Sequence, residues 1–155
     1  MSVQPVYLDD YDPWDETRKW EAFLPIEPPK TTSQGKRLTM VGGKPRFFKS
    51  SDAKRADATY ESLLCQCAPE TPLEGPVRLV VEATWPWRKS EPKKRIALGR
   101  VWCDVKPDAD NFVKQLQDSL VACRVIDRDE KVVELVVRKF FGDKVGIFIR
   151  VEQAR

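Results

Sequence analysis

The chain contains no histidine among its 155 residues. This absence excludes Ser-His-Asp and Cys-His catalysis, histidine general bases and zinc sites with histidine ligands. If the protein activates water, that water must be bound by a metal ion or oriented by a lysine. Carboxylates and lysines are therefore the side chains that could carry its chemistry.

Cysteine is scarce, and the spacing of the four cysteines differs from that of common zinc ribbons and fingers. They are Cys65, Cys67, Cys103 and Cys123. We expect buried free thiols, with a metal site or redox chemistry as the less favoured alternatives.

Long apolar runs are absent as well, and none approaches the length that spans a bilayer. Residues 1–4 lack the basic and apolar regions of a signal peptide. The sequence therefore predicts a cytoplasmic protein with no membrane partner.

Length and composition, with 41% hydrophobic and 33% charged residues, predict one globular domain with a sizeable core. The net charge of +3 is unevenly distributed, because residues 1–21 hold six acidic and two basic side chains and the remainder carries +7. We expect an acidic N-terminal arm at residues 1–21 and a single domain at residues 22–155. A basic domain is compatible with a polyanionic partner, although a solvated lysine-rich surface explains the charge equally well.

The hydrophobic pattern alternates between strand and helix periods. The expected strands are 22–26, 38–41, 46–48, 76–85, 131–140 and 145–152, and the expected helices are 51–67 and 110–122. The second and third strands form a basic hairpin. This order predicts an α+β fold, in which a mixed sheet carries the two main helices on one face.

The most informative segment is Lys-Pro-Asp-Ala-Asp-Asn-Phe-Val-Lys at residues 106–114. Asp108 and Asp110 stand at the start of the expected helix, where a carboxylate can simply cap the helix. Capping needs only one of them, however, and Lys114 lies one turn beyond Asp110. Neighbouring carboxylates repel one another unless a cation joins them, and Mg²⁺ prefers such oxygen ligands. A cation held beside a lysine is suited to phosphodiester cleavage.

These residues resemble a known family. The pattern KPDxDNxxK at residues 106–114, the Asp-Ser-Leu at 118–120 and an acidic turn before a strand are similar to the RusA family of Holliday junction resolvases. Upstream, a Pro-Pro-Lys turn, a Gly-Lys-Pro-Arg-Phe-Phe stretch and a Pro-Leu-Glu-Gly-Pro-Val stretch fit the same family. The resemblance covers residues 23–151 and leaves the acidic arm outside it.

The resemblance implies a homodimeric, Mg²⁺-dependent endonuclease that nicks four-way DNA junctions symmetrically in recombination and repair, with Mn²⁺ as a substitute metal. It implies that Asp108, Asp110 and Asp129 bind the metal and that Lys114 is catalytic. It also implies a bacterial cell, or a host infected by a phage, as the location. The family has paired aspartates where this chain has Arg128-Asp129, so Asp127 is the alternative ligand if the turn is shifted.

Basic side chains in the expected hairpin and in the loop before the motif are the candidates for phosphate contacts. They are Lys36, Arg37, Lys44, Arg46, Arg88, Lys89, Lys93, Lys94 and Arg95. Three tryptophans flank these stretches, namely Trp85, Trp87 and Trp102. One of them could stack on an unpaired base, although core packing is the favoured role.

Two alternatives to the nuclease remain open. The first is a DNA-junction binding module that has lost catalysis, which Arg128 in the acidic turn suggests. The second is an unrelated interaction protein whose acidic arm engages a basic partner.

Overall fold

The structure is a computed structural model that describes residues 12–30, 36–49 and 51–155. Its elements, in chain order, are β1 (Trp14–Leu24), β2 (Lys36–Val41), β3 (Lys44–Lys49), α1 (Ser51–Cys67), β4 (Val77–Trp85), α2 (Lys93–Ile96), β5 (Arg100–Trp102), α3 (Ala109–Ala122), the 3₁₀ turn η1 (Asp129–Lys131), β6 (Val132–Gly142) and β7 (Gly146–Ala154). None of the described helices is both long and apolar enough to cross a membrane.

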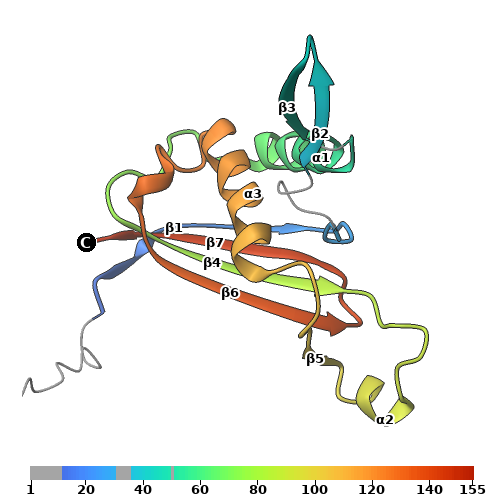
Figure 1. The fold of residues 1–155 in the computed structure, drawn as a ribbon. Helices are drawn as coiled ribbons and strands as arrows, with labels where there is room; N and C mark the ends of the chain where they lie inside the picture. The colour runs from blue at the N-terminus through green and yellow to red at the C-terminus, as the bar shows by residue number, and fades with distance from the viewer. Residues whose placement is uncertain (1–11, 31–35, 50) are drawn as a thin grey trace, which may run out of the picture.

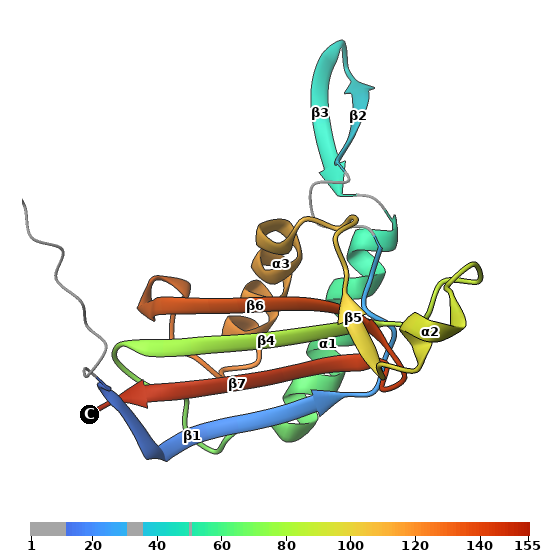
Figure 2. The same ribbon diagram turned by 90° about the horizontal axis from the view of Figure 1, so that it is seen from below.

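The main sheet has five strands in the order β1-β7-β4-β6-β5. The central strands β4 and β6 run parallel, whereas the other neighbouring pairs are antiparallel. The helices α1 and α3 cover one face of this sheet (Figure 1), and the opposite face is open when seen from below (Figure 2). The predicted α+β fold with a mixed sheet and helices on one face is confirmed.

The core lies between the sheet and the helices α1 and α3. Strand β4 alternates as predicted, and Val77, Leu79 and Val81 are completely buried. The buried stripe of α3 belongs to the same apolar cluster, to which it contributes Phe112 and Leu116. Each such side chain stabilises the fold by about 1.5–3 kcal/mol when it leaves water. This packing fixes which face of α3 points to solvent.

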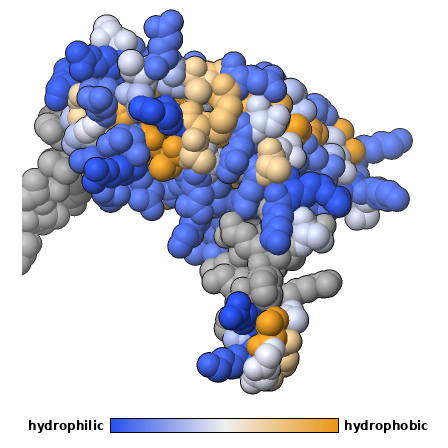
Figure 3. Space-filling model, turned by 90° about the horizontal axis from the view of Figure 1, so that it is seen from above, coloured by the Kyte–Doolittle hydropathy of each residue, from blue (hydrophilic) through white to orange (hydrophobic). Residues whose placement is uncertain are grey.

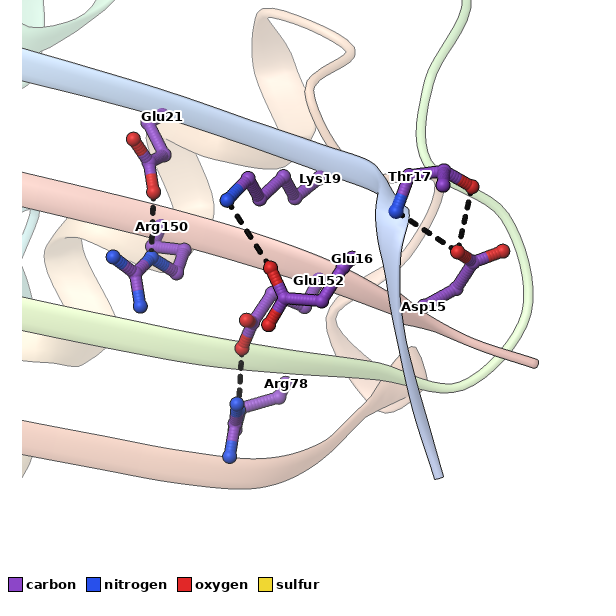
Figure 4. A network of polar contacts seen from close by, with 8 residues as sticks. All are labelled: Asp15, Glu16, Thr17, Lys19, Glu21, Arg78, Arg150 and Glu152. Atoms are coloured by element: carbon purple, nitrogen blue, oxygen red, sulfur yellow. Dashed lines mark hydrogen bonds and ion pairs between the residues drawn. The ribbon is translucent and has the colours of Figure 1, made fainter. Parts of the chain in front are cut away.

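Ion pairs cross between strands on the open face of the sheet. Glu152 on β7 is 1% exposed, and it accepts a hydrogen bond from Nε of Arg78 on β4 at 2.5 Å. This bond raises the pKa of the Arg78 guanidinium. Arg150 pairs with Glu21 of β1 in the same way at 2.7 Å (Figure 4).

The first strand is longer than expected. Residues 22–26 were predicted as a short strand, but β1 begins at Trp14 and pairs with β7 at Trp14 and again from Lys19 to Leu24. The sheet therefore starts inside the segment predicted to be an acidic arm, of which residues 1–11 lie outside the described chain. Two further short elements, α2 and β5, were not predicted and lie between β4 and α3.

The expectation of four buried free thiols is wrong. Cys65 of α1 and Cys123, directly after α3, form a disulfide with a Cα–Cα distance of 5.0 Å. Cys103 is free and buried, whereas Cys67 is free and exposed. The bond ties together the two helices that cover the sheet.

The hairpin of β2 and β3 forms a separate two-stranded sheet that projects from the body (Figures 1 and 2). Gly42 and Gly43 form its turn with φ of 60° and 74°, values that glycine adopts without strain. Met40 and Val41 beside the turn are exposed, and Figure 3 shows hydrophobic and hydrophilic side chains together on this projection. The predicted basic hairpin is thus present.

Candidate active site

The candidate site begins where β5 leads into α3. Two hydrogen bonds hold the intervening loop on β6: Cys103 N donates to the Lys139 carbonyl at 2.9 Å, and Lys139 Nζ donates to the Val105 carbonyl at 2.5 Å. The loop then delivers Asp108 and Asp110 to the N-terminal end of α3, and both are exposed. Because positive dipole charge gathers at this end of a helix, it favours two carboxylates in one turn.

Asp108 occupies the capping position of α3 without acting as a cap. Its backbone is extended, with φ −64° and ψ 142°, yet its side chain makes no capping hydrogen bond within the described chain. Within the described chain, the one polar contact of this side chain is a long one, in which Asn111 Nδ2 donates to Oδ2 at 3.5 Å. The capping role that the sequence left open is therefore not filled, and the carboxylate is free to meet a ligand.

Lys114 lies one turn beyond Asp110, and it is exposed while the next two residues, Gln115 and Leu116, are buried. No ion pair among the described residues involves Asp108, Asp110 or Lys114. The packing of α3 therefore directs two uncompensated negative charges and one positive charge toward solvent. Such charges are available to a cation and to a phosphate.

Asp129 lies elsewhere. It is the first residue of η1, which follows the C-terminal end of α3, whereas Asp108 and Asp110 stand at the N-terminal end (Figure 1). A helix of 14 residues is about 20 Å long. Within the described residues, no group of three or more acidic, cysteine or histidine side chains is close enough to hold a metal ion. A single chain brings together Asp108, Asp110 and Lys114, but it leaves Asp129 apart from them.

The acidic residues of the turn at 127–130 differ in their contacts with Arg128. Arg128 Nε lies 3.8 Å from an oxygen of Asp127, and its Nη1 lies 3.6 Å from Glu130. Asp129 takes part in neither of these pairs and is exposed. Of the two aspartates that the sequence offered as the third ligand, Asp129 is the one that makes no ion pair with Arg128.

Two carboxylates fit a Mg²⁺ ion by their chemistry, because this ion usually keeps several waters and takes one or two protein carboxylates. Their exposure leaves room for those waters and for a phosphate oxygen. The donor set is all oxygen, which disfavours zinc and copper. Asp108 and Asp110 are therefore the residues at the start of α3 that could hold a divalent cation.

The basic loop before β5 contains a residue that the sequence analysis missed. Glu91 is 8% exposed and pairs with both Arg88, at 2.9 Å, and Arg95, at 2.8 Å. Its hydrogen bond raises the pKa of the Arg88 guanidinium. The spacing of three and four residues between these charges was the signal that could have revealed it. Glu91 therefore holds in place the side chains of Arg88 and Arg95, two of the residues predicted to contact phosphates.

The other predicted phosphate contacts are mostly open to solvent. Lys89, Lys93 and Lys94 are exposed in the loop and in α2. Lys44 and Arg46 are exposed on the hairpin, while the side chains of Lys36 and Arg37 lie outside the described part of the structure.

The three tryptophans differ in environment. Trp85 is 4% exposed and packs edge-on against Phe112, so core packing is confirmed for it. Trp87 donates its Nε1 hydrogen to Asp143 at 2.7 Å. Trp102 is 65% exposed, so core packing is wrong for this residue.

Comparison with known proteins gives a consistent picture. The family model described as endodeoxyribonuclease RusA matches residues 25–152. An uncharacterised protein of Bacillus subtilis, YqaN, is 32% identical over 126 residues, which cover 76% of this chain and 88% of that protein. A protein named crossover junction endodeoxyribonuclease rusA, from Lactococcus phage r1t, is 26% identical over 137 residues, which cover 87% of this chain and 98% of the phage protein.

Proposed function

Because this chain belongs to the RusA family of endodeoxyribonucleases, we propose that it resolves four-way DNA junctions by paired, Mg²⁺-dependent hydrolysis during recombination and repair. The observation that carries the proposal is that Asp108 stands at the start of α3 without capping it. A carboxylate kept exposed beside Asp110 has no structural role among the described residues. Its position is explained if the two acids bind a metal ion.

Each residue then has a distinct task. Asp108 and Asp110 would hold Mg²⁺, or Mn²⁺ in its place, and the ion would supply neutralisation of phosphate charge and activation of a water. Lys114 is exposed one turn along the helix, where its ammonium group can stabilise charge that develops on the phosphate or on the leaving oxygen. The exposed lysines of the loop and hairpin bind flanking phosphates, which makes affinity strongly dependent on salt.

A homodimer accounts for the position of Asp129. Strand β5 pairs only with residues 140–142 of β6, so the outer edge of the earlier part of β6 has no strand partner among the described residues. Val133 and Leu135 on this strand are 63% and 44% exposed. Such an edge invites pairing with a second chain. Four-way junctions have two-fold symmetry, which a two-fold dimer would match.

Antiparallel pairing of two β6 strands would also complete the site. Asp129 lies three residues before β6 begins. Asp108 follows β5 by six residues, and β5 pairs with the end of β6. In an antiparallel pair the start of one strand lies beside the end of the other, which brings the partner subunit's Asp129 toward Asp108 and Asp110. The dimer would therefore supply the third carboxylate that one chain lacks.

A second candidate function is a junction-binding module without catalysis. It is favoured by the lack of a three-carboxylate group within the described chain. It differs from the nuclease in one measurable respect, because it binds branched DNA but leaves the strands intact.

Incubation with a labelled four-way junction and Mg²⁺ distinguishes the two functions. The nuclease gives paired nicks that disappear with EDTA. Asp110→Asn and Lys114→Met should lower cleavage about 100-fold or more while junction binding persists. Glu70→Gln changes an exposed carboxylate outside the site and is the matched control. Tight binding by the parent protein with no cleavage at any Mg²⁺ or Mn²⁺ concentration would establish the binding module instead.

A further inference from the structure

The exposed ring of Trp102 lies on the open face of the sheet. Its ring stacks on Phe140 with centroids 4.7 Å apart and planes 22° from parallel. Phe140 is only 4% exposed, whereas Trp102 remains 65% exposed. Phe140 therefore supports the indole from one side, and much of the remaining indole surface faces solvent.

The position of this ring is fixed before any ligand arrives. Trp102 is the backbone partner of Phe140 in the pairing of β5 with β6. The next backbone amide, that of Cys103, is also bonded to β6. Large aromatic rings usually lose water on folding, as Trp14 and Trp85 do at 7% and 4% exposure. A rigid exposed ring can bind a second planar group with little loss of conformational entropy.

Charged side chains surround the ring, and arginines outnumber carboxylates among them. Trp102 lines a pocket of about 590 Å³ together with Arg95, Arg100 and Arg138. Arg100 and Arg138 share the single carboxylate of Glu82, at 2.9 and 3.0 Å. Arg95 shares Glu91 with a second arginine in the same manner. Asp104 also lines the pocket and acts on Arg88. The four arginines of the two clusters therefore face three carboxylates, and a net charge of +1 remains around the ring.

We propose that Trp102 stacks on one unpaired base of the DNA substrate, while the guanidinium groups around the pocket bind the adjoining phosphates. This inference rests on the proposed nuclease function, and it explains how the protein would recognise its DNA substrate. An exposed ring beside several guanidinium groups suits a nucleotide, which joins a planar base to an anionic phosphate.

This site favours branched DNA over an intact duplex. In a duplex both faces of each base are covered by its neighbours, whereas an unpaired nucleotide at a branch point has a face to offer. Trp102 precedes Asp108 by six residues, which limits their separation to roughly 20 Å. A base held at Trp102 therefore lies a few nucleotides from the phosphodiester at the carboxylates. Stacking would place the branch point relative to the cut.

The test uses the full chain and four-way junctions that carry 2-aminopurine at the branch point, with Ca²⁺ in place of Mg²⁺. The parent protein should quench the probe through stacking. Trp102→Ala should abolish the quenching and weaken junction binding about 5- to 150-fold, the range for loss of one stacked base. Trp102→Phe should retain most of both signals, and Trp102→Leu should retain neither. Binding of a fully paired duplex should be unchanged in all three variants.

Phe23→Ala provides the matched control, because Phe23 is an exposed aromatic residue on β1 at the other edge of the sheet. Equal quenching and affinity for the parent and Trp102→Ala would overturn the stacking site, while continued Mg²⁺-dependent cleavage would leave the nuclease function intact. A loss of dimer in sedimentation with unchanged DNA binding would instead assign Trp102 to a subunit interface. Failure of the parent to bind any branched DNA would overturn both proposals.

Discussion

Asp108 directly precedes α3 and Asp129 is the first residue of η1, so the whole length of α3 separates these two carboxylates in one chain. In the proposed dimer, Asp108 shares its metal ion with the partner subunit's Asp129. This arrangement makes a distinctive prediction if each site uses acids from both subunits. Asp108→Asn and Asp129→Asn should each be inactive alone. In a mixed dimer both substitutions fall in one site, and the other site is intact.

We therefore expect that mixing the two inactive variants restores nicking of one junction strand, without paired cuts. The measurement is strand-specific labelling of the junction after subunit exchange. If each site belonged to a single chain, every site in the mixed dimer would carry one substitution and the mixture would stay inactive. Mixing Asp108→Asn with Asp110→Asn is the control, because both residues come from the same end of the same chain.

The ion pair between Arg78 and Glu152 should contribute strongly to stability (Figure 4). Arg78→Met leaves a carboxylate whose side chain is 2% exposed without its guanidinium, and the expected loss is about 3 kcal/mol of unfolding free energy. Arg150→Met breaks a pair whose side chains are 37% and 39% exposed, so it should cost at most about 1 kcal/mol.

Urea denaturation at neutral pH measures both losses. The double variant Arg78→Met with Glu152→Gln should recover part of the stability, because no uncompensated buried charge remains. Equal losses for Arg78→Met and Arg150→Met would show that burial of Glu152 does not decide the strength of the pair.

The disulfide between Cys65 and Cys123 closes a long loop, since the two residues are 58 positions apart. Reduction, or the substitution Cys65→Ser, should lower the unfolding free energy by about 2–4 kcal/mol. Thiol titration of the denatured, unreduced protein should find two free thiols per chain, those of Cys67 and Cys103, and four after reduction. Four thiols before reduction would contradict the bond.

Tyr60 is 1% exposed, and its hydroxyl has no hydrogen-bond partner among the described residues. Burial raises the pKa of this hydroxyl above its usual value. In the unfolded chain it ionises near pH 10, so above that pH only the unfolded state loses the proton, and stability should fall by about 1.4 kcal/mol per pH unit. Below pH 10 this group adds no dependence on pH.

Tyr60→Phe should remove that alkaline loss and should be as stable as the parent, or more so, at pH 8, because no buried hydroxyl remains unsatisfied. Urea denaturation at pH 8 and pH 10.5 measures the difference. The two other tyrosines are the same in both proteins, so they cancel. A parallel decline of parent and variant above pH 10 would contradict the raised pKa.

Much of the fold follows from the sequence because its main elements bury one regular face. Val77, Leu79 and Val81 alternate on β4, and Phe112 and Leu116 recur at helical spacing on α3. The N-terminal part of β1, residues 14–21, escaped prediction because only Trp14 is buried in it, and its pairing with β7 is interrupted between Trp14 and Lys19. Periodicity cannot reveal a strand whose side chains mostly face water.

The candidate site was predictable only in part. The spacing from Asp108 to Lys114 is local to one helix, so the sequence placed these residues together. The position of Asp129 depends on the direction in which α3 crosses the sheet, which no local spacing encodes. Trp102 was assigned to the core by its residue type, and it is exposed because β5 is a three-residue strand at the sheet edge.

The parallel pairing of β4 with β6 has a consequence for how such a protein can be altered. Parallel neighbours require the chain to return across the sheet between them, and that single excursion, residues 86–131, carries Trp102, Asp108, Lys114 and Asp129. The excursion can be exchanged as one cassette between relatives while the register of the two central strands is kept. Substrate preference should then follow the exchanged segment. The ion pairs on the open face of the sheet, Arg78 with Glu152 and Arg150 with Glu21, should stay with the protein that receives it.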